Sequence, residues 1–234
     1  QVPEFFNTVE EEDGTYIFPD GDTSAQPSGH LPSSGYFFDS IIRQDPIDED
    51  NLNPEDNLEE FGPISDEELE HFCREAERLS VETDVNGQGR RAILANFGGT
   101  AFGDIALVPA PWLKYPKGIR DVEEWYISTV SRRSYVYQVF ERQCEIALQN
   151  LDKIYEAVGD RIAAIFVSGT DFGMQTGPFI SPKTYRHLYK PFHKRVNDWI
   201  HERTAWKTFI HTCGSIIVLI PDLIEAGFDI LNPV

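Results

Sequence analysis

The sequence predicts an α/β protein built around a parallel β-sheet, and three observations support that prediction. Four apolar segments have the composition of core strands, and they end at Phe97, Ser168, His211 and Asn232. Helical sequence separates each segment from the next, as expected of strand–helix–strand units. Glycines and polar residues follow the segments closely, and in a parallel sheet these carboxyl ends share one edge. This is the arrangement of the active face of a (β/α)8 barrel, or TIM barrel.

The barrel is expected to be incomplete in this chain. A full barrel has eight strands and about 250 residues, whereas the 234 residues offer only four candidate barrel strands. We therefore expect a half-open barrel in which the strand Phe228–Asn232 lies at an edge, with Ile230 and Leu231 partly exposed. The sequence starts at Gln1 and stops at Val234, inside or just after a strand, so we expect a piece of a longer enzyme.

The N-terminal segment has a different character. Residues 1–64 are expected to form an acidic β-meander followed by a connector. The pair Asp13-Gly14 is a hairpin-turn signal between two short apolar segments, and residues 35–39 can form another short strand. The sequence thus predicts two domains, with the partial barrel occupying residues 65–234.

The first helix of the predicted barrel is expected to start at Ser65. Ser65 and Glu68 form a capping-box pattern ahead of apolar residues at helical spacing. A second helical region covers 121–158, predicted as two pieces, and Gly159 supplies its stop signal.

Two further helices follow the strand that ends at Ser168. Ser181 is expected to cap a helix that runs toward Arg203, with a kink or break near Pro191 because proline lacks an N–H group. Ser215 is expected to cap the next helix, and Gly227 to end it.

Acidic residues concentrate in the first part of the chain. The net charge is −19 at pH 7, and residues 1–70 hold twenty of the 39 acidic residues but one of the 20 basic residues, Arg43. This distribution argues against a nucleic acid partner, whose phosphates require a basic surface. It favours either a solvated acidic surface or a docking surface for a basic partner.

Three widely spaced cysteines, Cys73, Cys144 and Cys213, do not make a disulfide framework. They suit a reducing compartment, so we expect a cytoplasmic protein. Cys73 and Cys144 fall in helical sequence and are interpreted as packing residues. No apolar run reaches about 18 residues, so no membrane-spanning segment is predicted.

The segment Lys207–Ser215 contains the clearest chemical pattern. His211 and Cys213 are two residues apart, and such side chains in a strand point the same way. Imidazole and thiolate are zinc ligands, and a catalytic zinc site has three protein ligands. The alternative is a hydrogen-bonded histidine beside an inert, buried cysteine. The pattern by itself leaves both interpretations open.

Polar residues after the other strands are candidates for the same site. Asp171, among glycines that permit close ligand approach, is interpreted as a substrate-facing acid and candidate catalytic residue; the alternative is a turn carboxylate that accepts from backbone N–H groups. Asn96, Gln175 and Asn232 are candidate substrate-binding residues, with loop hydrogen bonding as the alternative. We expect Asp171, Asn96 and Asn232 to line one cavity with His211.

Two long motifs resemble the uroporphyrinogen decarboxylase superfamily. The first runs from Ser168 to Pro182 and is followed by Lys190-Pro191-Phe192; the second runs from Phe209 to Val234. Together with the helices between them, they cover about residues 150–234. The resemblance implies a (β/α)8 barrel and a choice between two chemistries.

The resemblance is closer to the methyltransferase branch, which transfers methyl groups with corrinoids and thiols. That branch holds zinc through His-x-Cys and a more distant cysteine. The resemblance therefore implies His211 and Cys213 as metal ligands, a third ligand beyond Val234, and cobalamin carried by a partner corrinoid protein. The decarboxylases of the family work without a metal and use an arginine-rich segment near the first barrel strand, whereas this chain has only the isolated Arg43 before residue 71.

The function expected from these features is zinc-dependent methyl transfer between a small methyl donor, cobalamin or a thiol, in concert with a corrinoid protein. One alternative is a carboxy-lyase of porphyrin metabolism that resembles uroporphyrinogen decarboxylase. A second is a non-catalytic barrel fragment that binds a partner through its acidic first third.

Overall fold

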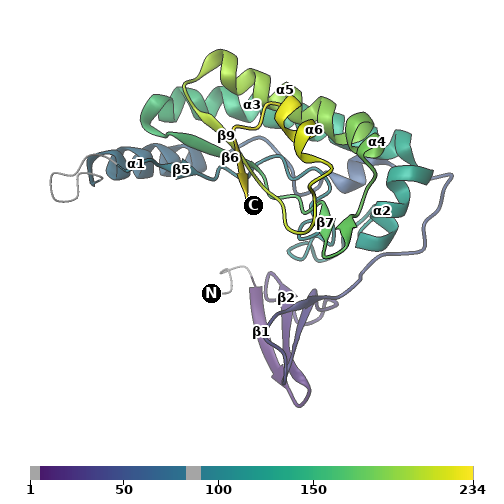
Figure 1. Ribbon diagram of the computed structural model, residues 1–234. Helices are drawn as coiled ribbons and strands as arrows, with labels where there is room; N and C mark the ends of the chain where they lie inside the picture. The colour runs from purple at the N-terminus through teal and green to yellow at the C-terminus, as the bar shows by residue number, and fades with distance from the viewer. Residues whose placement is uncertain (1–5, 83–90, 234) are drawn as a thin grey trace. The chain divides into compact units, whose positions relative to one another are not determined.

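The computed structural model describes residues 6–82 and 91–233 (Figure 1). The chain divides into two compact units. The first comprises Gln1–Glu60 with Ile105–Tyr135, and the second comprises Phe61–Asp104 with Val136–Val234. The division at residue 64 that the sequence suggests stays a prediction of domain organisation.

The first unit contains the expected antiparallel meander, with strand order β1-β2-β3-β4. Its strands are β1 (Phe6–Glu11), β2 (Gly14–Pro19), β3 (Gly29–Pro32) and β4 (Asp39–Ser40). The predicted strand over residues 35–39 is wrong, because residues 35–38 form a loop between the strands Gly29–Pro32 and Asp39–Ser40. The β1–β2 hairpin turns one residue before the predicted Asp13-Gly14 pair: Glu11 pairs with Gly14, so Glu12 and Asp13 form the turn and Gly14 begins β2. A Cβ atom at Gly14 would lie 2.1 Å from the carbonyl oxygen of Leu31, so the close pairing of β2 with β3 at this position requires glycine.

Two buried arginines bind the irregular parts of the first unit together. Arg43 is 8% exposed and donates to the backbone oxygens of Leu113 (2.5 Å) and Ala110 (2.7 Å). Arg120 pairs with Glu60 at 2.7 Å, with side chains only 1% and 4% exposed. Buried charges are tolerated when they are paired and hydrogen-bonded. The one basic residue of segment 1–70 is therefore turned inward.

The second unit is built on a parallel sheet with strand order β10-β9-β6-β5. Its strands are β5 (Leu94–Ala95), β6 (Ala164–Ser168), β9 (Lys207–His211) and β10 (Ile230–Asn232). A separate antiparallel hairpin, β7 (Gly173–Met174) and β8 (Gly177–Pro178), follows β6. The predicted mixed α/β fold with a parallel sheet is confirmed, and the assignment of that sheet to a (β/α)8 barrel that is incomplete in this chain stays a prediction.

Both outer strands of the parallel sheet agree with a half-open arrangement. In the described part of the chain β10 pairs on one side only, with β9. Ile230 is 38% exposed and Leu231 is half-buried, as expected of an edge strand. At the opposite edge, β5 is shorter than the predicted segment because the side chain of Asn96 accepts from the N–H of Gly98 (3.0 Å) and turns the chain away.

Six α-helices are described, and most begin and end where the sequence indicates. They are α1 (Asp66–Glu82), α2 (Val122–Ser131), α3 (Arg133–Val158), α4 (Pro182–Thr184), α5 (Lys190–Arg203) and α6 (Ile220–Glu225). Shorter helical turns are η1 (Pro54–Asn57), η2 (Gly159–Arg161) and the π-helical η3 (Tyr185–Tyr189). The capping box precedes α1: Glu68 N–H donates to Ser65 Oγ (3.2 Å), and Ser65 N–H donates to Glu68 Oε2 (2.9 Å). None of the described helices is long and apolar enough to cross a membrane.

The helical segment after Ser181 breaks where Pro191 predicts it. Ser181 Oγ caps α4 by accepting from Thr184 N–H (3.1 Å). Before α5, the Lys190 N–H donates to the carbonyl oxygen of Tyr185, five residues back. Pro191 has no N–H group and its ring interferes with the preceding turn, so a wider π-helical turn replaces regular α-helix here.

The predicted start of the next helix is wrong. The sequence suggests Ser215 as its cap, but α6 begins at Ile220. Ser215 N–H instead donates to the carbonyl oxygen of Met174 (2.8 Å). Pro221 explains the later start, because its ring would clash with a carbonyl group one turn earlier in a longer helix. The end of the helix is as predicted, with Gly227 at φ 91°.

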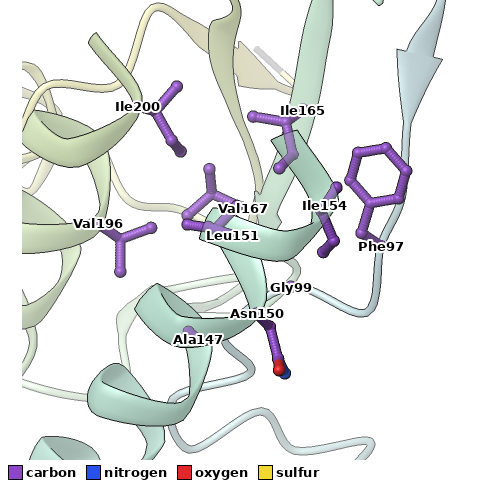
Figure 2. Close-up of a pocket in the computed structure, with 10 residues that line it drawn as sticks. All are labelled: Phe97, Gly99, Ala147, Asn150, Leu151, Ile154, Ile165, Val167, Val196 and Ile200. Atoms are coloured by element: carbon purple, nitrogen blue, oxygen red, sulfur yellow. The ribbon is translucent and has the colours of Figure 1, made fainter. Parts of the chain in front are cut away.

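Helices α3 and α5 cover one face of the parallel sheet (Figure 1). Figure 2 shows a small, mainly apolar cavity of about 40 Å³ within this layer. Its lining residues are Phe97, Gly99, Ala147, Asn150, Leu151, Ile154, Ile165, Val167, Val196 and Ile200. Because Ile165 of β6 points into this layer, Phe166 belongs to the opposite face, where its ring stacks on Phe209 of β9 (5.6 Å between centroids). His211, two residues after Phe209, continues that opposite face toward the carboxyl end of β9.

Candidate metal centre

His211 and Cys213 converge at the carboxyl end of β9. His211 is the last residue of the strand, and its Nε2 atom lies 3.2 Å from Cys213 Sγ. His211 is half-buried and Cys213 is exposed. The two-residue spacing predicts this convergence, and the structure confirms it. Their role as metal ligands stays a prediction.

Asn232 orients the imidazole of His211 from the neighbouring strand. The parallel pairing of β10 with β9 sets Asn232 opposite His211, and Asn232 Oδ1 lies 2.9 Å from His211 Nδ1. An amide oxygen only accepts, so Nδ1 carries the proton. The lone pair of His211 is then on Nε2, the nitrogen that faces Cys213, which is the usual arrangement of a metal-binding histidine.

Asp171 brings a carboxylate to the same place from the loop after β6. Its Oδ1 atom accepts from the backbone N–H of Cys213 at 2.6 Å. One ligand atom from each of Asp171, His211 and Cys213 lies within 4.8 Å of the other two. Asp171 therefore combines the turn-type hydrogen bond anticipated as its alternative role with a position next to the histidine and cysteine.

A close approach of two glycines joins the loops that carry these residues. Gly173 N–H donates to the carbonyl oxygen of Cys213 (3.1 Å), and a Cβ atom at Gly214 would lie 2.1 Å from the carbonyl carbon of Gly173. Gly214 also has φ 87°, in the left-handed region. The buried Thr212 Oγ1 accepts from Phe172 N–H at 2.9 Å. These contacts hold the loop after β6 against the loop after β9.

We expect Gly214→Ala to separate the two loops. The added methyl group overlaps backbone atoms, and alanine in the left-handed region costs about 1–3 kcal/mol. The free energy of unfolding should fall by at least that amount, and the affinity for zinc should fall with it. Urea denaturation and a competition titration with a chromophoric chelator measure the two effects.

Gly62→Ala is the matched control, because a Cβ atom at Gly62 meets nothing within 4 Å. Wild-type stability and affinity in Gly214→Ala would contradict the close approach.

The electrostatics around Cys213 depend on whether a cation is present. The pKa of the Cys213 thiol is raised, first by partial desolvation of the sulfur and then by the charge and hydrogen bond of Asp171. In the absence of a cation the thiol therefore stays protonated next to the His211 lone pair. A divalent cation reverses this preference, because it stabilises a thiolate and a carboxylate together.

Nitrogen, sulfur and oxygen donors fit zinc in type and in spacing. Zinc binds imidazole nitrogen at about 2.0–2.1 Å and thiolate sulfur at about 2.3 Å, so a tetrahedral site separates these two atoms by about 3.6 Å. The separation between His211 Nε2 and Cys213 Sγ is 3.2 Å. A shift of a few tenths of an ångström would accommodate the ion, and Asp171 supplies a third donor within the described residues.

Asn96 and Gln175, the other predicted substrate-binding residues, do not belong to the cluster of Asp171, His211 and Cys213. Asn96 makes the turn with Gly98 at the end of β5, and Gln175 is exposed in the β7–β8 hairpin. Their assignment as substrate-binding residues stays a prediction. The orienting contact of Asn232 with His211 was not foreseen, and neither was the Gly173–Gly214 approach. The glycine after each of Phe172 and Cys213 was the only local signal for that approach.

Comparisons with known proteins give one similar fold and no similar sequence. No protein-family model matches the sequence, and no curated protein matches it. Among solved structures, the fold is similar to that of a methyltransferase from Methanosarcina mazei, with a TM-score of 0.46 and 14% sequence identity. The match covers 70% of this chain and 40% of the methyltransferase, so the chain spans well under half the length of that protein.

Proposed function

We propose that this chain carries the zinc centre of a methyltransferase-type enzyme of the uroporphyrinogen decarboxylase superfamily. The observation that carries the proposal is the convergence of His211 Nε2, Cys213 Sγ and the Asp171 carboxylate at the end of a parallel strand. The resemblance of segments Ser168–Pro182 and Phe209–Val234 to that superfamily supports the same assignment.

His211, Cys213 and Asp171 would hold the ion, and the surrounding residues prepare them for it. Zinc bound there would lower the pKa of a coordinated thiol or polarise a leaving oxygen. Asn232 keeps the proton of His211 on Nδ1, which leaves Nε2 free to bind. The hydrogen bond from the Cys213 N–H to Asp171 orders the turn that presents the sulfur.

The proposed reaction moves a methyl group between cobalamin on a partner corrinoid protein and a small thiol or methyl donor. In the thiol direction, the sulfur attacks the methyl carbon and forms a carbon–sulfur bond. The carbon–cobalt bond breaks at the same time, its electron pair stays on cobalt, and the thiol proton goes to solvent.

The test uses the full chain, loaded with zinc, together with methylcobalamin and 2-mercaptoethanol. We expect zinc-dependent demethylation of methylcobalamin, followed by its visible absorbance, and formation of the methyl thioether, followed by mass spectrometry. Cys213→Ala should remove both signals. Stable zinc binding without thioether formation, with methylcobalamin or with methylated corrinoid proteins, would refute methyl transfer and leave the metal centre intact.

Replacement of Asn232 should weaken metal binding rather than substrate binding. Loss of a residue that orients a metal-ligating histidine lowers metal affinity about 10–100-fold. We therefore expect Asn232→Ala to lower zinc affinity by that factor in a chelator competition, because His211 loses its fixed tautomer. Asn232→Asp, which keeps an acceptor oxygen, should retain wild-type affinity or better.

A different result would support substrate binding, the role that the sequence suggested for Asn232. Unchanged zinc affinity in Asn232→Ala, combined with a raised KM for the methyl acceptor, would identify Asn232 as a substrate-binding residue.

A further inference from the structure

Three consecutive aromatic side chains project from the loop between β3 and β4 in the first unit. Tyr36 is 92% exposed, Phe37 is 83% exposed and Phe38 is 39% exposed. Single apolar side chains are common on protein surfaces, but adjacent exposed aromatic side chains are typical of interaction sites. We refer to Tyr36–Phe38 as the aromatic tip.

The base of the aromatic tip is held by backbone hydrogen bonds. Gly35 N–H donates to the carbonyl oxygen of Pro32 at 2.8 Å and closes a turn just before the tip. Directly after the tip, Asp39 pairs with His30 as β4 joins β3. The tip is therefore presented from an ordered support, which lowers the conformational entropy that binding would otherwise cost.

The sheet that carries the aromatic tip is strongly acidic. Acidic residues of its described strands include Glu10, Glu11 and Asp39, and those of the adjoining turns include Asp13, Asp20 and Asp22. Arg43, the one basic residue of segment 1–70, is buried and donates to carbonyl groups. Lys114 from the same unit reaches Asp20 (3.5 Å) and Asp22 (3.6 Å) and offsets only part of this charge.

These charges select the kind of partner. A surface of one sign attracts a partner of the opposite sign and repels one of its own sign. A second copy of this acidic unit and an anionic membrane are both disfavoured for that reason. A basic protein surface is favoured, and exposed aromatic rings are the side chains that most often anchor such contacts.

We propose that the aromatic tip and its acidic sheet form a docking surface for a protein partner with an apolar pocket rimmed by lysine and arginine. Tyr36 and Phe37 enter the pocket as anchors, and the acidic residues steer the approach and fix its orientation. This surface is independent of the metal centre: it stands whether or not the protein transfers methyl groups.

The test measures binding of a fluorescently labelled amphipathic helical peptide of leucine and lysine to the full chain by anisotropy. The variant Tyr36→Ser/Phe37→Ser removes the anchors and keeps every charge. The variant Tyr115→Ser/Val130→Ser is its matched control, because these residues are 71% and 69% exposed elsewhere in the same unit. A leucine–glutamate peptide and phosphatidylcholine vesicles test the other classes of partner.

We expect the tip variant to weaken binding of the lysine peptide by about tenfold or more, as loss of an anchor does, and the control variant by no more than about twofold. The unfolding midpoint of the tip variant should match that of the wild type. Equal binding by both variants would overturn the proposal, as would binding of the glutamate peptide or of the vesicles with comparable affinity. A clear loss of stability in the tip variant would also overturn it, because the tip would then be packed against its own chain.

Discussion

Cys213→Ala should abolish retention of zinc by the purified full chain. Among the described residues, the variant removes the sulfur donor of the His211 site and leaves one imidazole and one carboxylate, too few for a catalytic zinc site. Metal content after dialysis, measured by inductively coupled plasma mass spectrometry, should fall from one ion per chain to background. His211→Ala should have the same effect.

A half-buried cysteine outside the site supplies the control. Cys73 lies in α1, and Cys73→Ala should leave the metal content unchanged. Full zinc retention by Cys213→Ala would refute the assignment of this site. Loss of zinc in Cys213→Ala but not in His211→Ala would show that the sulfur binds without the imidazole and that the convergence in the structure has another role.

Arg120→Met should lower the free energy of unfolding more than the substitution of an exposed charged residue does. Arg120 and Glu60 form a pair with 1% and 4% exposed side chains, and removal of one partner leaves a buried, uncompensated charge. Such changes cost about 3–5 kcal/mol. Urea denaturation should show this loss in the free energy of unfolding.

Two further variants test whether the loss of stability comes from the unpaired buried charge. Arg142→Ala breaks an exposed pair with Glu145 and should cost no more than about 1 kcal/mol. The double variant Arg120→Met/Glu60→Leu removes both buried charges and should recover a large part of the stability lost in Arg120→Met. A loss below about 1 kcal/mol in Arg120→Met would show that water reaches Glu60 in solution.

Features that depend on near neighbours in the chain could be predicted from the sequence. The capping box at Ser65, the end of the second helical region at Gly159 and the break near Pro191 all follow from the chemistry of a few consecutive residues. The convergence of His211 with Cys213 was predicted from alternation along a strand, but β9 ends at His211, and the loop after the strand places Cys213 through its hydrogen bond to Asp171.

The remainder of the site depends on strand register and loop packing. Asp171 reaches Cys213 across 42 residues and Asn232 reaches His211 across 21. Which polar side chain meets which is set by the pairing of β10 with β9 and by the contact of Gly173 with Gly214. No local pattern encodes those distances.

The environment of Arg43 also depends on contacts between segments that are remote in the sequence. Composition shows Arg43 as an isolated basic residue in the acidic segment 1–70, and only the tertiary structure places it in the interior, where it donates to carbonyl groups of residues 110 and 113. The start of α6 at Ile220 follows from a local feature that the sequence analysis did not weigh, Pro221 in the first turn. The sequence by itself determined the order of the main helices and core strands and the two-residue spacing of His211 and Cys213. Only the tertiary structure decided which distant groups complete the centre, because hydrogen bonds and packing between remote segments select among partners that are locally equivalent.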